Sequence, residues 1–122
     1  MNPVLIIAVA TTVAAGAAST QQSQATAAAA RAALLAPEGY TVTLSCPQRV
    51  FPPFGVKVTE REGKLVARFP RCESELQEPQ AGVFRGEYCG SQPFQWVYRP
   101  GDPARTFSGT GGRMCAVELA RR

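Results

Sequence analysis

The 122-residue sequence predicts an α+β protein, in which a long N-terminal apolar helix precedes a small, disulfide-stapled antiparallel β-sheet or barrel domain. The charges are unevenly distributed: Arg31 is the only ionisable side chain in residues 1–37, whereas 12 of the 13 basic and all 9 acidic residues fall in 38–122. The second part contains short β-branched and aromatic stretches separated by Gly and Pro, and it carries all four cysteines. We therefore divide the chain into a helical segment, residues 1–37, and a β domain, residues 38–122.

The first element is a helix. Residues 4–19 form an uncharged run without proline, and an Ala-rich stretch continues from it to Pro37. Asn2 followed by Pro3 is typical of a helix start, because Asn caps free N–H groups and Pro has its φ preset for the first turn. Pro37 predicts the end, since the residue before a proline is disfavoured in the α region. We predict one mostly continuous helix over residues 3–36, roughly 50 Å long and therefore longer than a ~30 Å bilayer core.

Two interpretations of this segment compete. A cleaved secretory signal peptide would use an apolar region from Val4 to about Ala15, but the residues before it contain no Lys or Arg. A retained transmembrane signal anchor is short for a span, yet small residues recur every four positions on one helix face, where another helix could approach closely. We expect the retained anchor, with its second half outside the membrane. The helix-packing residues of this face are Ala8, Thr12, Gly16 and Thr20.

The β domain is expected to contain seven strands. Glu62-Gly63-Lys64 predicts a hairpin turn, because Gly readily adopts a positive φ. The glycine-rich residues 108–112 are interpreted as a flexible loop, and the stretch that holds Glu73, Glu75 and Glu78 as a solvated loop. The predicted strands are Tyr40–Ser45, Val56–Arg61, Leu65–Phe69, Val83–Cys89, Phe94–Tyr98, Thr106–Ser108 and Arg113–Leu119.

The cysteines predict two disulfides. Their separations of 26, 17 and 26 residues contain no C-x-x-C spacing of the kind that zinc ribbons use. We slightly favour a nested pairing, Cys46 with Cys115 and Cys72 with Cys89, while the sequential pairing of first with second and third with fourth stays open. A domain of this size gains much from such staples, and disulfides indicate an oxidising compartment. We therefore expect the domain on the periplasmic or extracellular side of the membrane.

No catalytic constellation is visible. The chain has no histidine, which excludes a Ser/His/Asp triad, a Cys/His dyad and a histidine metal site. The net charge of +4 comes mostly from arginines that are interspersed with glutamates, so no basic run predicts nucleic-acid binding. We expect a protein that is not an enzyme, with no cofactor, no metal and no small-molecule substrate.

Aromatic residues gather in two segments, Phe51-Pro52-Pro53-Phe54 and residues 94–98. In a strand, Phe94, Trp96 and Tyr98 would share one face. That face is expected to be the core. If it were exposed, it would form a docking surface together with the adjacent Arg99.

These observations favour a non-catalytic accessory or structural subunit of a larger membrane-bound assembly. Such a subunit would be anchored by its N-terminal helix and would dock through the exported β domain. Its expected partners are other membrane-protein subunits and the lipid bilayer. The alternatives are a cleaved-signal, soluble periplasmic or secreted binding domain, or a surface-filament subunit.

Overall fold

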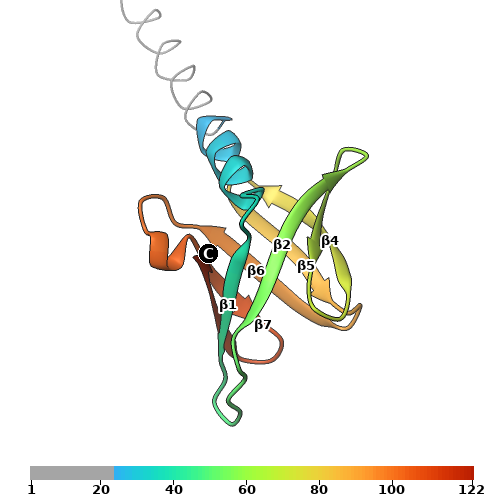
Figure 1. Ribbon diagram of the computed structural model, residues 1–122, viewed down its shortest axis with the longest axis vertical. Helices are drawn as coiled ribbons and strands as arrows, with labels where there is room; N and C mark the ends of the chain where they lie inside the picture. The colour runs from blue at the N-terminus through green and yellow to red at the C-terminus, as the bar shows by residue number, and fades with distance from the viewer. Residues whose placement is uncertain (1–23) are drawn as a thin grey trace, which may run out of the picture.

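The computed structural model describes residues 24–122, which form a closed antiparallel barrel below a helix (Figure 1). Each strand pairs with the next one in the sequence, and β8 pairs with β1 from Tyr40↔Arg121 to Ser45↔Ala116. The sequence predicts a sheet or a barrel, and the chain forms the barrel. Its elements are β1 (Tyr40–Ser45), β2 (Phe54–Arg61), β3 (Lys64–Arg68), β4 (Glu73–Gln80), β5 (Val83–Tyr88), β6 (Gln92–Tyr98), the 3-10 helix η1 (Pro103–Arg105), β7 (Phe107–Gly111) and β8 (Cys115–Arg121).

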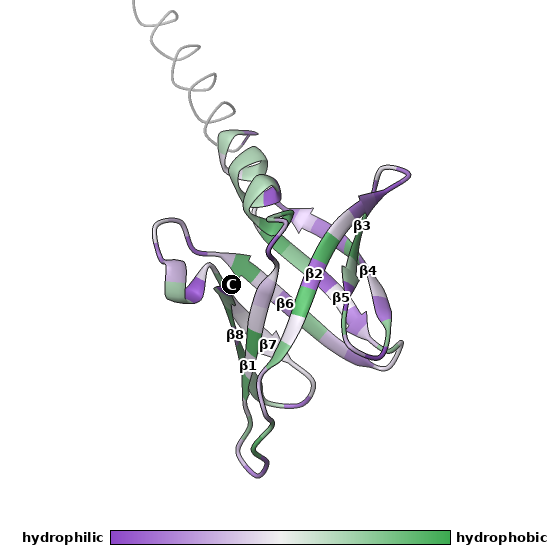
Figure 2. Cartoon of the chain, in the orientation of Figure 1, coloured by the Kyte–Doolittle hydropathy of each residue, from purple (hydrophilic) through white to green (hydrophobic). Residues whose placement is uncertain are grey.

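Local sequence signals located most of the strands. Each of the seven predicted strands overlaps an observed one, and β1 has the predicted bounds. Glu62 and Gly63 connect β2 to β3 with φ values of 54° and 77°. Two consecutive positive φ angles are typical of a type I′ turn, whose twist matches that of the flanking strands. The predicted hairpin is therefore confirmed, and its tip is hydrophilic (Figure 2).

The acidic stretch predicted to be a loop is strand β4, so that prediction is wrong. Ser74 and Leu76 point into the barrel and are buried, while Glu73 and Glu75 lie on the outer face. The outward glutamates face basic residues of neighbouring strands: Glu73 pairs with an arginine of β2 at 2.8 Å, and Glu75 with a lysine of β3 at 3.8 Å. The alternating pattern was hidden because the inward positions carry one serine and one leucine.

The glycine-rich stretch is also a strand rather than a flexible loop. Gly109 lies opposite Trp96 in the β6–β7 ladder, where a Cβ atom would collide with the backbone of Gln95. At Gly111, a Cβ atom would lie 2.8 Å from a methyl group of Val117. Glycine is required here because of close packing, so its presence does not indicate flexibility.

The helix covers one end of the barrel. Residues 24–34 are helical and a turn at residue 35 precedes Pro37, as the predicted stop requires. Ala30 and Leu34 are fully buried, and the Tyr40 hydroxyl donates a hydrogen bond to the carbonyl of Ala33. None of the helices within residues 24–122 has the length and hydrophobicity to cross a membrane. The first part of the predicted helix, with the packing residues Ala8, Thr12, Gly16 and Thr20, lies outside the described residues.

Aromatic rings fill the barrel interior. Phe69 is central, since its ring centroid lies 5.0 Å from that of Tyr88, 5.6 Å from that of Phe94 and 6.2 Å from that of Trp96. These pairs adopt the edge-to-face geometry that aromatic quadrupoles prefer. Phe94 and Trp96 are 8% and 2% exposed. The core interpretation of the 94–98 segment is therefore confirmed for these two side chains.

The two disulfides have the nested pairing, Cys46–Cys115 and Cys72–Cys89. The first joins the end of β1 to the start of β8. The second bridges the loop before β4 to the residue after β5, at the opposite end of this strand pair from the irregular pairing between Gln77 and Gln80. The prediction of two disulfides and the preference for nested pairing are both confirmed.

Candidate functional site at the open end of the barrel

The end of the barrel opposite the helix is open. Here the long β1–β2 loop, residues 46–53, and the neighbouring β7–β8 turn, residues 112–114, project past the strands and line a half-open cavity of about 1190 Å³. Cys46–Cys115 joins the bases of these two segments. We call this cavity and its rim the barrel mouth. Its interior wall is formed mainly by Leu44, Phe54, Phe69, Tyr88, Phe94 and Trp96.

The wall of the mouth is apolar because the strands alternate. On β1, Val42 and Leu44 point inward, whereas Thr43 between them is exposed. On β6, Phe94 and Trp96 point inward in the same way. Trp96 and Phe69, at 2% and 6% exposure, pack together deep in the mouth, so the barrel is filled between the cavity and the helix. The barrel is therefore open at the mouth and closed at the helix end.

The rim carries exposed hydrophobic side chains. In the described part of the chain, the large hydrophobic residues that are exposed are Val50 at 98%, Met114 at 86% and Phe51 at 38%. All three belong to the two segments that flank the mouth. A single exposed apolar side chain is ordinary, but a group beside an apolar cavity indicates a binding surface.

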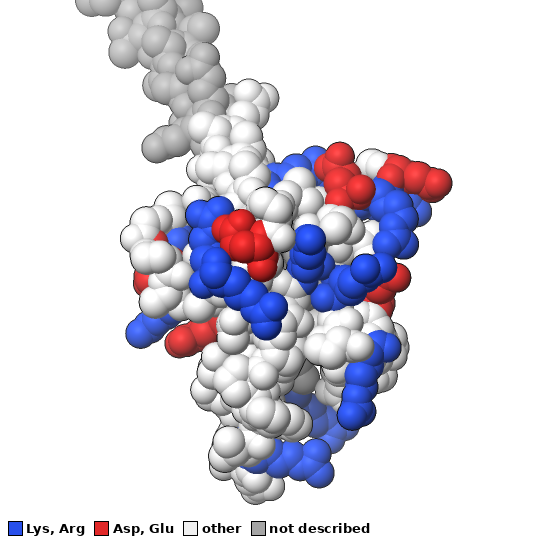
Figure 3. Space-filling view, viewed as in Figure 1, with Lys and Arg blue, Asp and Glu red and all other residues white. Residues whose placement is uncertain are grey.

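The charges at the mouth have one sign. Arg49, Arg71 and Arg113 line it, and no Asp or Glu does so among the residues that the structure describes. On the face drawn in Figure 3, the acidic side chains lie on the upper part and the lower tip shows only basic ones. The sequence gives no hint of this separation, because the three arginines are far apart in the chain and glutamates are interspersed among the arginines. Closure of the barrel brings them to one opening.

The docking surface considered for Phe94, Trp96, Tyr98 and Arg99 does not form on the outside of the barrel. Phe94 and Trp96 are inside it, and Tyr98 is half-buried against Phe107, with ring centroids 5.5 Å apart. Strand alternation places all three on the inner face. That exposed-face alternative is therefore wrong, although Phe94 and Trp96 line the mouth from within.

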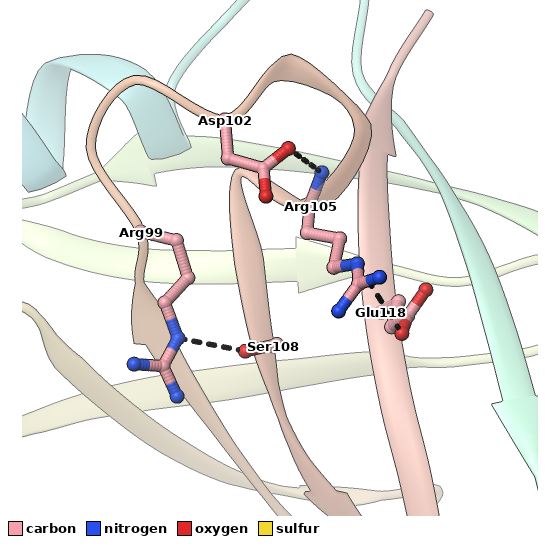
Figure 4. Close-up of polar contacts among 5 residues, drawn as sticks. All are labelled: Arg99, Asp102, Arg105, Ser108 and Glu118. Atoms are coloured by element: carbon pink, nitrogen blue, oxygen red, sulfur yellow. Dashed lines mark hydrogen bonds and ion pairs between the residues drawn. The ribbon is translucent and has the colours of Figure 1, made fainter.

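Arg99 is exposed but has a local structural partner. Its Nε donates a hydrogen bond to Ser108 Oγ at 2.9 Å, across the β6–β7 hairpin (Figure 4). In the same hairpin the Asp102 carboxylate accepts from the backbone N–H of Arg105 at 3.2 Å, and the Arg105 guanidinium lies 3.7 Å from Glu118. These contacts hold the long hairpin that contains η1.

The described residues show no arrangement typical of catalysis. All four cysteines are in disulfides, and residues 24–122 contain no group of three or more Cys, Asp or Glu side chains placed to hold a metal ion. Burial raises the pKa of the Tyr40 hydroxyl above its ordinary value, an effect that the nearby Arg121 guanidinium opposes. Tyr40 lies under the helix, away from the mouth, and its hydroxyl is used to hold the helix.

Comparison with protein-family models, curated protein sequences and solved structures finds no significant match to this chain.

Proposed function

We propose that this chain is a non-catalytic binding domain of an exported protein, and that the barrel mouth is its binding site. The observation that carries the proposal is the contrast between the two ends of the barrel. The helix covers one end with Ala30 and Leu34, whereas the other end has an apolar cavity and exposed Val50 and Met114 at its rim. An eight-stranded barrel is just wide enough to hold its own side chains or one small ligand.

The exported location is supported by the disulfides. All four cysteines are paired, and such bonds persist in oxidising compartments such as the periplasm or the cell exterior. Both bonds lie at the mouth end of the barrel. One joins the β1–β2 loop to the start of β8, and the other joins the β3–β4 loop to the β5–β6 turn. They therefore hold in place the segments that an occupant would contact.

The test is the binding of N-phenyl-1-naphthylamine, a neutral apolar dye whose fluorescence rises in an apolar site. The full chain should give a saturable increase. Leu44→Trp fills the mouth from its wall and should abolish most of the signal, because Leu44 lines the cavity. Thr43→Trp is the matched control, since Thr43 is the adjacent exposed residue on the outer face and its variant should bind the dye normally. Absence of saturable binding by the unchanged protein would contradict the proposal.

The second candidate function is the accessory subunit of a membrane-bound assembly. It is favoured by the same rim, because Val50 and Met114 would be covered if the loops docked against another subunit. Extraction in mild detergent followed by sizing separates the two candidates. Migration of the native protein in a large particle would support the subunit, and a soluble species with the mass of one chain would contradict it.

A further inference from the structure

We propose that the barrel mouth binds a single-chain anionic amphiphile, with an alkyl tail inside the cavity and a carboxylate head among Arg49, Arg71 and Arg113. This inference rests on the proposed function and specifies the ligand. It is drawn from the joint presence of an apolar interior, a basic rim and a single entrance.

The rim arginines are available for an anion. The ion pairs within residues 24–122 engage other basic residues, namely Arg61, Lys64, Arg105 and Arg121. Arg49, Arg71 and Arg113 are all exposed, and their guanidinium groups have no partner among the described residues. Guanidinium groups bind carboxylates with two parallel hydrogen bonds, and a mouth without acidic residues attracts anions over some distance.

The interior is suited to a hydrocarbon tail. Most residues that project into it from the strands are aliphatic or aromatic, including the Tyr88 ring, and the polar side chain of Gln92 lies beside Gly112 at the rim. A nucleotide or sugar would bury polar groups there without hydrogen-bond partners, which is costly. A linear chain fits an opening that ends at the packed pair of Trp96 and Phe69.

The cavity depth sets a limit on the tail. Because Trp96 is 2% exposed and the barrel is filled beyond it, the tail cannot pass toward the helix. Affinity should therefore rise by up to about fourfold for each added methylene that is buried. It should level off once the chain reaches Trp96, and further methylenes should remain outside.

Trp96 is the only tryptophan and lies in the cavity wall, so its fluorescence reports occupation directly. The titration uses dodecanoate, dodecanol and dodecyltrimethylammonium at neutral pH, with the two ionic probes below their critical micelle concentrations and dodecanol below its solubility limit. The three probes share one tail and differ in the charge of the head. Dodecanoate should bind about tenfold more tightly than dodecanol, and the cation should bind most weakly.

Two triple variants locate the head group. Arg49→Gln, Arg71→Gln and Arg113→Gln together should weaken dodecanoate binding about tenfold and leave dodecanol binding unchanged. The control has the same loss of charge at exposed positions away from the mouth: Arg31→Gln, Lys57→Gln and Lys64→Gln. It should leave both affinities unchanged. The comparison of head groups in the unchanged protein does not depend on the folding of any variant.

Three results would overturn this inference. If the neutral dye binds but dodecanoate has no advantage over dodecanol, the mouth is a binding site without anion preference and the proposed function survives alone. If the protein sediments with phosphatidylglycerol vesicles and shows no binding of monomeric dodecanoate, the rim docks on a membrane surface. If neither dye nor dodecanoate binds, the proposed function fails as well.

Discussion

Replacement of Gly109 by alanine tests the tightest backbone contact in the barrel. A Cβ atom at this position would lie 2.9 Å from the carbonyl carbon of Gln95, closer still to its oxygen, and 3.4 Å from the Cα atom of Trp96. Ordinary contacts begin near 3.4 Å, so β6 must move by at least 0.5 Å, the difference between 3.4 and 2.9 Å. These atoms belong to the paired strand and cannot rotate away as a side chain could.

The expected cost is at the upper end of what overpacking produces, about 3 kcal/mol of the free energy of unfolding. For a domain of about 100 residues, this lowers the melting temperature by roughly 12–24 °C. The gain from restricting the unfolded chain, about 0.4–1 kcal/mol for Gly→Ala, offsets only a small part. Trp96 lies opposite Gly109 in the ladder, so its fluorescence should also change in the folded variant.

Gly55→Ala is the matched control. It is the same change on strand β2, where the Cβ atom would meet the guanidinium group of Arg122, the exposed end of a flexible side chain, at 2.8 Å. That group can move aside, so stability should stay within about 1 kcal/mol of the unchanged protein. The assay is urea unfolding monitored by Trp96 fluorescence. If Gly109→Ala is no less stable than Gly55→Ala, the glycine requirement at the β6–β7 ladder is refuted.

Two further predictions concern stability. Removing Cys46–Cys115 by serine replacement should lower the free energy of unfolding by about 4.4 kcal/mol, and removing Cys72–Cys89 should lower it by about 3.1 kcal/mol. The first bond costs more because its 69-residue separation restricts the unfolded chain more than the 17-residue separation of the second. Urea unfolding that gives the reverse order would contradict this account. Tyr40→Phe should cost about 1 kcal/mol near neutral pH. Burial raises the pKa of Tyr40, so the neutral hydroxyl stabilises the fold fully below about pH 10, and this stabilisation declines as the pH rises through the raised pKa. The free energy of unfolding of Tyr40→Phe should therefore not show this decline at alkaline pH.

Strand positions were predictable where the local pattern is strong. Residues Tyr40–Ser45 alternate between large side chains that face the core and small polar ones, and this pattern predicts the observed bounds of β1. The strands that were missed or shortened are those whose sequence has another common meaning. Glutamates in β4 are typical of a solvated loop, and glycines in β7 are typical of a flexible one. Their strand structure depends on contacts with neighbouring strands. The glutamates of β4 pair with basic residues of β2 and β3, and Gly109 of β7 packs against the backbone of β6.

The candidate site was less predictable than the fold. The sequence marks Phe94 and Trp96 as important aromatic residues, but their inward direction and their place in the cavity wall depend on barrel closure. The sequence also does not indicate that Arg49, Arg71 and Arg113 lie close together, because they come from three different loops. Residues distant in the chain form a site only when the strands between them fix their positions.

The sequence by itself determined the properties that act over a few residues or through composition: the charge division near residue 37, the helix end before Pro37, most strands, the hairpin turn and the availability of four cysteines. The tertiary structure decided the closure of β1 onto β8, the pairing of the cysteines and the different character of the two barrel ends. The physical reason is that backbone propensity and alternation are local, whereas the choice of which end is covered depends on where the helix packs. The helix buries Ala30 and Leu34 at one end, and the uncovered rim with its three arginines lies at the other end.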